Sequence, residues 1–405
     1  MAATKEKRSD TGARLVEGPQ GRRSRLTEIA SYFLKLGFLG FGGPLALMAA
    51  YQKDLVEGRK WISNERFGQA LALIKALPGA TATQTAIYLG SVRGGRLGGI
   101  VAGTCLIAPS FFMMLALGAF YTSVEALAWS KPLLFGMQAA ALGVITESVW
   151  RLAKPYRGDA VFWVVTAVAA ALTALRPSME PLVIIGSGIL GALLLKLSEL
   201  GPDKKRNLAA FALPAFLVGS SGASLGILTK LVGVFLKAGF VVFGTGLAVV
   251  PLLKHDVVDT HHWLTNQQFM DALAFGQITP GPVLITSTFI GYKVAGLVGA
   301  AVATAGVFFP GFFNILTWFP IAERKLGNSP YTRRFVLFAV GAVIGSILVT
   351  VARLAAAPAV GGTHTLAAVV GGGALLLALF TKIPVWLLIP GGGALSIALQ
   401  ALVGS

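Results

Sequence analysis

The sequence predicts an all-α protein that crosses a membrane many times and is built from two related repeats. Of its 405 residues, 55% are hydrophobic and 13% are charged, whereas soluble domains carry about 25% charged residues. Apolar runs recur along the whole chain, and each approaches the roughly 20 residues that a helix needs to span a bilayer. A long segment of the first half also returns in the second. These observations exclude a soluble globular domain and a disordered chain, and they predict about 12 to 13 membrane segments.

The chain is strongly basic, with its positive charge in the first residues and in short loops. The formal net charge is +17. Because basic segments favour the cytoplasmic side of a membrane, residues 1–26 are expected to form a basic cytoplasmic tail, with binding to anionic lipid as the alternative. The charge does not gather on a soluble domain, so nucleic acid is not an expected partner. The single cysteine, Cys105, excludes an intramolecular disulfide.

Twelve apolar runs fall into two sets of six. Residues 27–198 are predicted to form the first repeat, residues 199–228 a linker, and residues 229–405 the second repeat. Residues 208–228 are apolar but interrupted by Pro and Gly, so they form either a thirteenth span or a loop on the membrane. The runs lie at 27–50, 67–90, 97–121, 132–150, 160–176, 181–198, 230–253, 268–291, 294–320, 335–353, 364–380 and 383–403.

The two sets are copies of one sequence. Residues 33–61 match residues 235–263 without a gap, so the offset is 202 throughout. The match continues through two Pro-Gly pairs, and after the loss of one residue Pro109 corresponds to Pro310. Composition bias cannot hold Trp, Asn, Lys and Asp in register over such a length. The chain therefore contains an internal duplication.

The distribution of basic residues favours an inverted arrangement of the two repeats. With the tail in the cytoplasm, the basic residues of the first repeat fall mainly in cytoplasmic loops. The most basic loop of the second repeat, 321–334, reaches the same side only if that repeat is turned over. This inversion requires residues 208–228 to cross the membrane. Inverted repeats place a binding site near the bilayer midplane in many membrane proteins.

A glycine motif interrupts the first run of each repeat. Phe-Gly-Gly-Pro occupies 41–44, and Phe-Gly-Thr-Gly occupies the corresponding 243–246. Gly and Pro break a helix and free backbone groups, which the membrane interior tolerates only beside protein or a water-filled cavity. A helix that restarts there directs unpaired N–H groups and the positive end of its dipole inward, which favours an anion. Close packing of helices by small residues is the alternative interpretation.

A Pro-Gly motif interrupts the second run of each repeat, at 77–81 and at 279–283. Proline in a first helical turn loses no hydrogen bond, so each motif indicates a break followed by a restart. Two breaks per repeat supply four helix ends, enough donors to surround a tetrahedral oxyanion; kinks without a ligand are the alternative. Hydroxyl or amide side chains follow the breaks: Thr81, Thr83, Gln84 and Thr85 in one copy, and Thr286, Ser287 and Thr288 in the other.

Three lysines inside or near the runs are candidate ligands. Lys75 precedes the first Pro-Gly motif, and its counterpart is Gln277. A lysine within a membrane is expected to serve a function, so Lys75 is the stronger candidate. Lys35 and Lys237 occupy corresponding positions and either anchor helix ends or attract ions at an entrance.

Acidic residues are scarce within the runs. Glu147 lies one turn from Arg151, a spacing that predicts an ion pair at a helix end. Asp271 begins a run of the second repeat, where the first repeat has Gln69. Either carboxylate could couple transport to protons.

Three of the four histidines lie within residues 255–262. With Asp259 they offer ligands that zinc accepts, which leaves an intramembrane metal enzyme as a remote alternative centred on His255, Asp259, His261 and His262. Among the residues that can bind a metal, the corresponding segment of the first repeat, 53–60, shares only an aspartate with it. A solvated loop that faces the cytoplasm is therefore expected, with no metal and no other cofactor.

The paired motifs resemble the chromate transporter family in its long, two-domain form. The pattern F-x-x-x-G-x-x-x-F-G-G-P, followed by Trp, Pro-Gly-Pro and Y-x-G, covers about 33–121 and 235–320. The resemblance implies export of chromate across the plasma membrane and chromate resistance, driven by the membrane potential or a proton gradient, with sulfate as a competing anion. It places the functional glycine motif on Phe41, Gly42, Gly43 and Pro44, and the Pro-Gly-Pro motif on Pro78, Gly79 and Ala80.

Three positions depart from the family pattern. The last Pro of the first Pro-Gly-Pro is Ala80, Leu47 stands where a histidine often follows, and Lys75 stands where glutamine is common. These departures bear on which anion is bound more than on the transporter class.

The motifs and the resemblance together predict a secondary transporter, not an enzyme, that exports a divalent tetrahedral oxyanion. Chromate is the expected anion; sulfate transport and a passive anion channel are the alternatives. The protein is expected to be multi-pass in the plasma membrane, with a cytoplasmic N-terminus and lipid contacts, and a homodimer is compatible with this reading. The candidate substrate-binding residues are Lys35, Phe41, Gly42, Gly43, Pro44, Lys75, Pro78, Gly79, Thr81, Gln84, Lys237, Gly244, Thr245, Gly246, Gln277, Pro280, Gly281 and Thr286.

Overall fold

A computed structural model describes residues 19–75, 77–125, 127, 129–199, 226–244, 246–326, 329–357 and 363–403. Within these residues every regular element is a helix, which confirms the all-α prediction. Six of the described helices are long and apolar enough to cross a membrane. The basic tail before residue 19, most of the predicted linker, and Thr245 lie outside the described residues.

The first repeat begins with two helical hairpins. Helices α1 (Pro19–Leu39) and α2 (Gly43–Tyr51) form the first, and the π-helix η1 (Gln52–Gly58) continues α2. Helix α3 (Asn64–Ile74) and the start of α4 (Thr81–Glu125) form the second. The backbone of α4 leaves helical geometry at Gly94 and Gly95, so this element is two helices joined by a sharp turn.

The second repeat copies this order. Helix α8 (Ile227–Val241) is followed by α9 (Val249–Leu253), which η6 (Lys254–Thr260) continues. Helix α10 (Asn266–Ile278) precedes η7 (Val283–Ile285) and α11 (Thr286–Phe313), which turns at Ala295 and Gly296 as α4 turns at its glycines. The breaks fall at the predicted Gly and Pro motifs in both copies.

The remaining helices surround these hairpins. They are α5 (Ser130–Ala153), η2 (Lys154–Tyr156), α6 (Ala160–Leu175), η3 (Pro177–Met179), α7 (Glu180–Glu199), η8 (Asn314–Trp318), α12 (Phe319–Leu326), α13 (Pro330–Ala356), α14 (His364–Phe380) and α15 (Val385–Val403).

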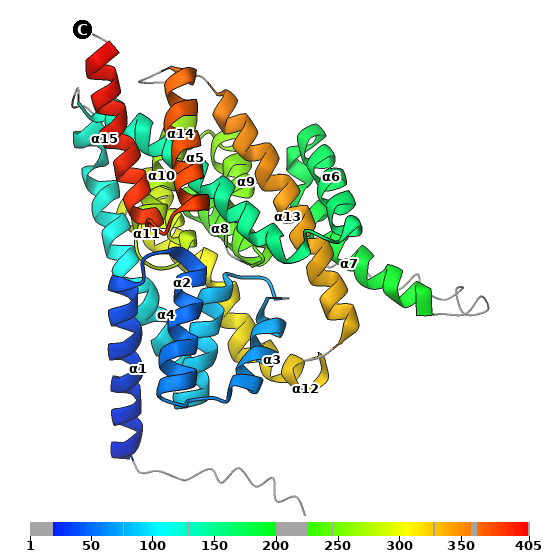
Figure 1. Cartoon of the computed structure of the whole chain (residues 1–405). Coiled ribbons are helices and arrows are strands. Elements are labelled where there is room, and N and C mark those ends of the chain that lie inside the picture. The colour runs from blue at the N-terminus through cyan, green and yellow to red at the C-terminus, as the bar shows by residue number, and fades with distance from the viewer. Residues whose placement is uncertain are drawn as a thin grey trace, which may run out of the picture.

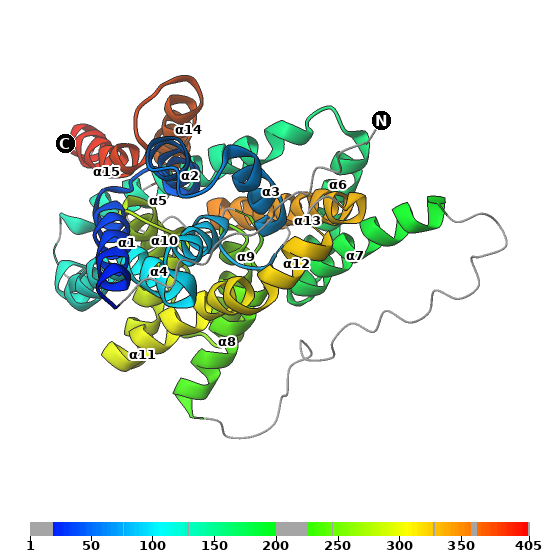
Figure 2. The same ribbon diagram turned by 90° about the horizontal axis from the view of Figure 1, so that it is seen from below.

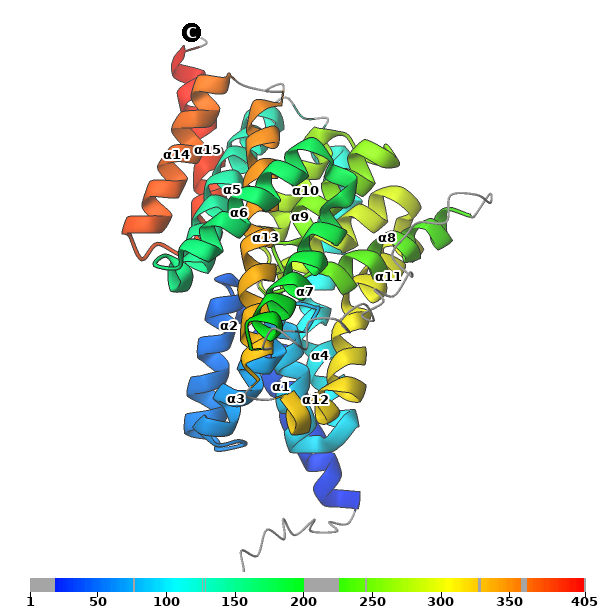
Figure 3. The same ribbon diagram turned by 90° about the vertical axis from the view of Figure 1, so that its right-hand side faces the viewer.

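The hairpins of the two repeats lie at opposite ends of the molecule. Helices α1, α2 and α3 occupy the lower part of Figure 1, whereas α9 and α10 occupy the upper part, and Figure 3 shows the same division. Figure 2 shows the pairs α6–α7 and α14–α15 on opposite sides of the central hairpins. Helix α12 lies at the end where α1 begins (Figure 1). This is the arrangement expected of inverted repeats.

The hairpin tips meet in the middle of the molecule and bond to each other through their backbones. The N–H of Gly79 donates to the carbonyl of Val242 at 2.6 Å, and the N–H of Gly281 donates to the carbonyl of Gly40 at 3.2 Å. At the offset of 202 between the repeats, Gly281 corresponds to Gly79 and Gly40 corresponds to Val242. The two bonds are therefore equivalent. The N–H of Thr81 also donates to the carbonyl of Gly244 at 3.0 Å. Each repeat therefore supplies hydrogen-bond partners for backbone groups that the breaks in the other repeat leave free.

The carbonyl groups of the two Pro-Gly motifs are satisfied by side chains. The Pro78 carbonyl accepts from Gln84 Nε2 at 2.6 Å and from Asn314 Nδ2 at 2.8 Å. The Pro280 carbonyl accepts from the Ser110 hydroxyl of α4. Because Asn314 directly follows α11, each long helix of one repeat supports the broken tip of the other.

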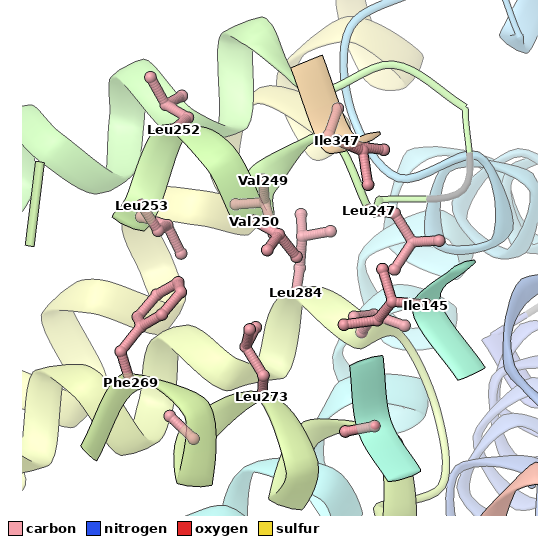
Figure 4. Close-up of a cluster of buried hydrophobic side chains, with 14 of the residues drawn as sticks. Ile145, Leu247, Val249, Val250, Leu252, Leu253, Phe269, Leu273, Leu284 and Ile347 are labelled. Carbon is pink, nitrogen blue, oxygen red and sulfur yellow. The ribbon is translucent and has the colours of Figure 1, made fainter. Parts of the chain in front are cut away.

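A packed apolar core fixes the hairpins of the second repeat (Figure 4). Val249 and Val250 of α9 lie with Leu284 of η7, while Ile145 of α5 and Ile347 of α13 belong to the same cluster. All five side chains are buried. Their burial holds the short helices around each break, which are too short to be stable alone.

The histidine-rich segment differs from its prediction in form. It is not a loop, because η6 continues α9 helically as far as Thr260. Its parent helix α9 lies at the end opposite α12 (Figure 3). The corresponding segments η1 and η6 therefore belong to hairpins at opposite ends of the molecule.

Replacing Gly79 by Ala is expected to destabilise the fold. Gly79 has a φ of +123°, and a Cβ there would lie 2.6 Å from Gln84 Nε2. Left-handed backbone costs an L-residue about 1–2 kcal/mol, and overpacking adds about 1–3 kcal/mol. Thermal unfolding of the purified protein in detergent should therefore shift to lower temperature.

The control for this change is Gly68→Ala in α3, where no atom lies within 4 Å of the added Cβ. This variant should unfold at the temperature of the unmodified protein or slightly above it, because Ala is the better helix former. Equal unfolding temperatures for the two variants would contradict the described tip.

Candidate functional site

A cavity of about 210 Å³ lies where the hairpin tips meet α5 and α13. Both repeats contribute to its wall, as an inverted repeat predicts. Eight of the predicted site residues line it: Gly42, Gly43, Pro44, Lys75, Thr81, Gly244, Gln277 and Gly281.

The glycine motifs form one side of the cavity. Gly42 and Gly43 have φ values of +101° and +70°, and α2 begins at Gly43 without a side-chain cap. The first N–H groups of a helix have no partner inside it and carry the positive end of its dipole. No atom lies within 4 Å of the position of a Cβ on Gly43 or on Gly244. Both glycines therefore leave space open beside the cavity that a side chain would fill.

Lys75 and Gln277, which occupy corresponding positions in the two repeats, both line the cavity. Lys75 lies at the C-terminal end of α3 and is exposed, whereas Gln277 lies in the last turn of α10. The buried Nε2 of Gln277 has no hydrogen-bond partner. An unpaired buried donor normally costs about 1–3 kcal/mol, so this amide is suited to bind a ligand.

Thr81 supplies a second unpaired polar group. Its side chain lines the cavity, is 6% exposed, and its hydroxyl has no partner. Its backbone N–H is already used to bond Gly244. The hydroxyl is therefore free to donate to a ligand.

An ion pair on α5 also lines the cavity, and this position was not predicted. Arg151 Nε donates to Glu147 Oε1 at 2.7 Å, which confirms the predicted i, i+4 pair. The side chain of Glu147 is 5% exposed and that of Arg151 47%. The spacing of the two residues predicts their pairing, but only the tertiary structure shows that α5 brings the pair to the glycine breaks.

The charged side chains of the described cavity wall are Lys75, Arg151 and Glu147. Together they give the wall one net positive charge. A cavity that combines positive charge, unpaired N–H and O–H donors and a small volume is suited to a small oxyanion.

The other two predicted lysines lie elsewhere. Lys237 forms a salt bridge with Asp256 at 2.5 Å, and Lys35 is exposed on α1. Neither lines the cavity. Their correspondence in the sequence reflects the duplication rather than a shared place in this site.

Several predicted residues support the hairpin tips instead of lining the cavity. Pro78, Gly79, Gln84 and Pro280 take part in the tip hydrogen bonds. Three others also lie outside the cavity wall. The ring of Phe41 lies 5.0 Å from that of Trp386, and Gly246 closely approaches Leu284. The Thr286 hydroxyl donates to the Val283 carbonyl at 2.9 Å. Thr245 lies outside the described residues.

Asp271 lies apart from the cavity. Its carboxylate is fully buried and accepts hydrogen bonds from the Tyr121 hydroxyl at 2.7 Å and from Gln138 Nε2 at 2.8 Å. Both donors come from the helices that precede it, α4 and α5. Asp271 therefore ties α10 to the first repeat.

The three histidines of residues 255–262 each have a different neighbour. His255 lies 3.4 Å from the Thr260 hydroxyl, His262 contacts the Val258 carbonyl at 2.8 Å, and His261 stacks on Trp263. Among the described residues, no group of three or more His, Cys, Asp and Glu side chains is arranged to hold a metal ion.

Cysteine labelling should detect the cavity directly. In a Cys105→Ala background, Ser148→Cys places a thiol in the cavity wall, whereas Ser287→Cys places one at a fully buried position outside it. A small water-soluble methanethiosulfonate reagent should label the first variant much faster than the second, because thiol reactivity requires access. Mass spectrometry follows the labelling of each variant. Equal labelling rates for the two variants would contradict the presence of the cavity.

Comparison with known proteins places the chain in a family. The family model described as chromate transporter matches residues 27–192 and 229–397, one region in each repeat. The chain is 39% identical to a chromate transport protein of Cupriavidus metallidurans, over 81% of this chain and 83% of that protein. It is 39% identical to a probable chromate transport protein of Synechococcus elongatus, over 80% and 84% of the two chains.

A chromate transport protein of Pseudomonas aeruginosa is 32% identical, over 74% of each chain. No solved structure matches the chain. The two matched regions together span most of the 405 residues and coincide with the duplicated halves. The chain is therefore a multi-pass membrane protein of the chromate transporter family.

Proposed function

We propose that this protein is a secondary transporter that exports chromate, a divalent tetrahedral oxyanion, from the cytoplasm and so confers chromate resistance. The observation that carries the proposal is the cavity at the meeting point of the hairpin tips. Its wall combines Lys75 and Arg151 with the unpaired groups of Thr81 and Gln277. The names of the relatives, which are chromate transport proteins, supply the choice of anion.

In this proposal the donors of the cavity replace the hydration shell of the anion. The start of α2 at Gly43 offers N–H groups and a positive dipole end. Thr81 and Gln277 donate from opposite repeats, and Lys75 and Arg151 neutralise charge. Hydrogen bonds between such donors and an ionised acceptor are stronger than neutral ones, which offsets the loss of hydration.

The proposed orientation places the lower end of Figure 1 in the cytoplasm. Ion pairs gather basic residues at this end: Glu28 binds Arg59 and Arg93, and Arg66 binds Glu323 across the repeats. Helix α12, whose sequence contains Arg324 and Lys325, lies there too (Figure 1). Because basic residues favour the cytoplasmic side, the N-terminus is assigned to the cytoplasm of a plasma-membrane protein.

Transport in inside-out membrane vesicles tests this function. Vesicles that contain the protein should accumulate labelled chromate, and excess sulfate should compete because it has the same charge and shape. Collapse of the membrane potential and the proton gradient should abolish accumulation against a concentration difference. Uptake that ignores both gradients would instead indicate a passive anion channel, and uptake of sulfate alone would identify a different substrate.

The Lys75→Gln variant should weaken anion binding without preventing folding. A hydrogen bond to a charged group contributes about 1.5–3 kcal/mol, which corresponds to a roughly ten- to hundredfold loss of affinity. Chromate uptake should therefore show a KM raised by about this factor. Lys53→Gln, on an exposed position of η1, should leave the KM unchanged. Unaltered transport by Lys75→Gln would show that the glutamine found in the second repeat suffices in both.

A further inference from the structure

The described wall of the cavity contains one carboxylate, that of Glu147. This carboxylate pairs with Arg151, the side chain best suited to bind the anion. Among the described residues of the wall, Glu147 is the sole acidic side chain. Arg151 Nε donates to its Oε1 at 2.7 Å. A guanidinium is the side chain that most often recognises planar or tetrahedral oxyanions through paired N–H groups. Glu147 and a bound dianion would therefore compete for the same cation.

We propose that binding of a dianion draws Arg151 away from Glu147 and that Glu147 then takes up one proton from solvent. This inference rests on the proposed function, and it names the group that couples anion transport to protons. The proton adds to a carboxylate oxygen of Glu147, whose charge changes from minus one to zero. No other bond forms or breaks.

Burial is the reason that the carboxylate cannot remain charged without its partner. The side chain of Glu147 is 5% exposed, whereas that of Arg151 is 47% exposed. The arginine can therefore turn toward an anion while keeping part of its hydration. Removing one partner of a buried ion pair leaves an uncompensated charge, which is strongly unfavourable. A carboxylate in that situation is neutralised by a proton instead.

The charge balance of the cavity supports the same stoichiometry. Lys75, Arg151 and Glu147 give the empty cavity one net positive charge. A dianion alone would leave one net negative charge in the interior of the protein. A dianion together with one proton on Glu147 leaves the cavity neutral, and neutral contents carry the smallest desolvation penalty.

The groups around Glu147 identify it as the proton acceptor. Lys75 at the end of α3, Arg151 on α5 and Tyr156 of η2 are the other titratable side chains of the described cavity wall. Of these side chains, the carboxylate of Glu147 is the one that becomes neutral by taking up a proton. Helices α10, α13 and α15 present the uncharged side chains of Gln277, Val336, Val340 and Val385.

For transport, the bound proton reduces the net charge of the loaded site. One dianion and one proton carry one net negative charge across the membrane in each cycle. An inside-negative membrane potential still drives this charge outward. The rate should therefore depend on both the potential and the pH, through Glu147.

Calorimetry of the purified full-length protein tests the inference. Sulfate is the probe, because it remains a dianion near neutral pH whereas chromate itself takes up a proton there. Titration in two buffers of different ionisation enthalpy counts the protons taken up on binding. The unmodified protein should take up about one proton per sulfate, and its affinity should fall about tenfold for each unit rise in pH where Glu147 is ionised in the free protein.

Two variants separate Glu147 from other carboxylates. Glu147→Gln mimics the protonated state, so it should bind sulfate with no proton uptake and with an affinity that does not change with pH. Glu57→Gln, at an exposed position of η1 outside the cavity, should behave as the unmodified protein does.

The outcomes distinguish this inference from the function on which it rests. Binding of sulfate to the unmodified protein without proton uptake would overturn the inference and leave the anion site in place, and this measurement decides even if Glu147→Gln does not fold. Equal proton uptake by the unmodified protein and Glu147→Gln would assign the proton to another group and would also overturn it. Absence of binding for both sulfate and chromate would overturn the proposed function itself.

Discussion

The broken helices at the centre of this protein leave backbone N–H and C=O groups without partners in their own helix. The need to hydrogen-bond these groups determines how the centre is built. In an apolar environment an unpaired N–H or C=O group is too costly to remain exposed. Each repeat meets this demand with the other repeat, through the reciprocal bonds from Gly79 to Val242 and from Gly281 to Gly40. The interruptions therefore act as the joint between the two halves. The N–H groups of Gly79 and Gly281 find these partners in the opposite half of the chain.

This joint also explains why the cavity lies where it does. The tips of four hairpin arms converge, and two of their left-handed glycines, Gly43 and Gly244, leave space that side chains would otherwise fill. Some of the freed N–H groups, such as that of Thr81, are consumed by the bonds between repeats. The donors that remain available come from the start of α2 and from side chains whose polar atoms have no partner. In the proposed site, structural and ligand-binding roles are thus divided among neighbouring atoms of the same motifs.

The repeats are similar in backbone and different in charge. Lys75 in one repeat corresponds to Gln277 in the other, and both line the cavity. Helix α5 contributes the ion pair of Glu147 and Arg151, whereas α13 contributes valines. A symmetric backbone can provide two equivalent sets of supports for alternating access. In the proposed mechanism these asymmetric charges set the stoichiometry of anion and proton.

The local sequence was sufficient to predict the helical breaks, because Gly and Pro change the backbone conformation of their own turn wherever the helix packs. The duplication and the i, i+4 spacing of Glu147 and Arg151 were readable for the same reason. Which of the candidate residues line the cavity was not readable, since this depends on contacts between segments about two hundred residues apart. Lys237 and Lys75 both lie close before a break in the sequence, yet one pairs with Asp256 and the other lines the cavity. Only packing in three dimensions distinguishes them, because a charge finds its partner through space and not along the chain.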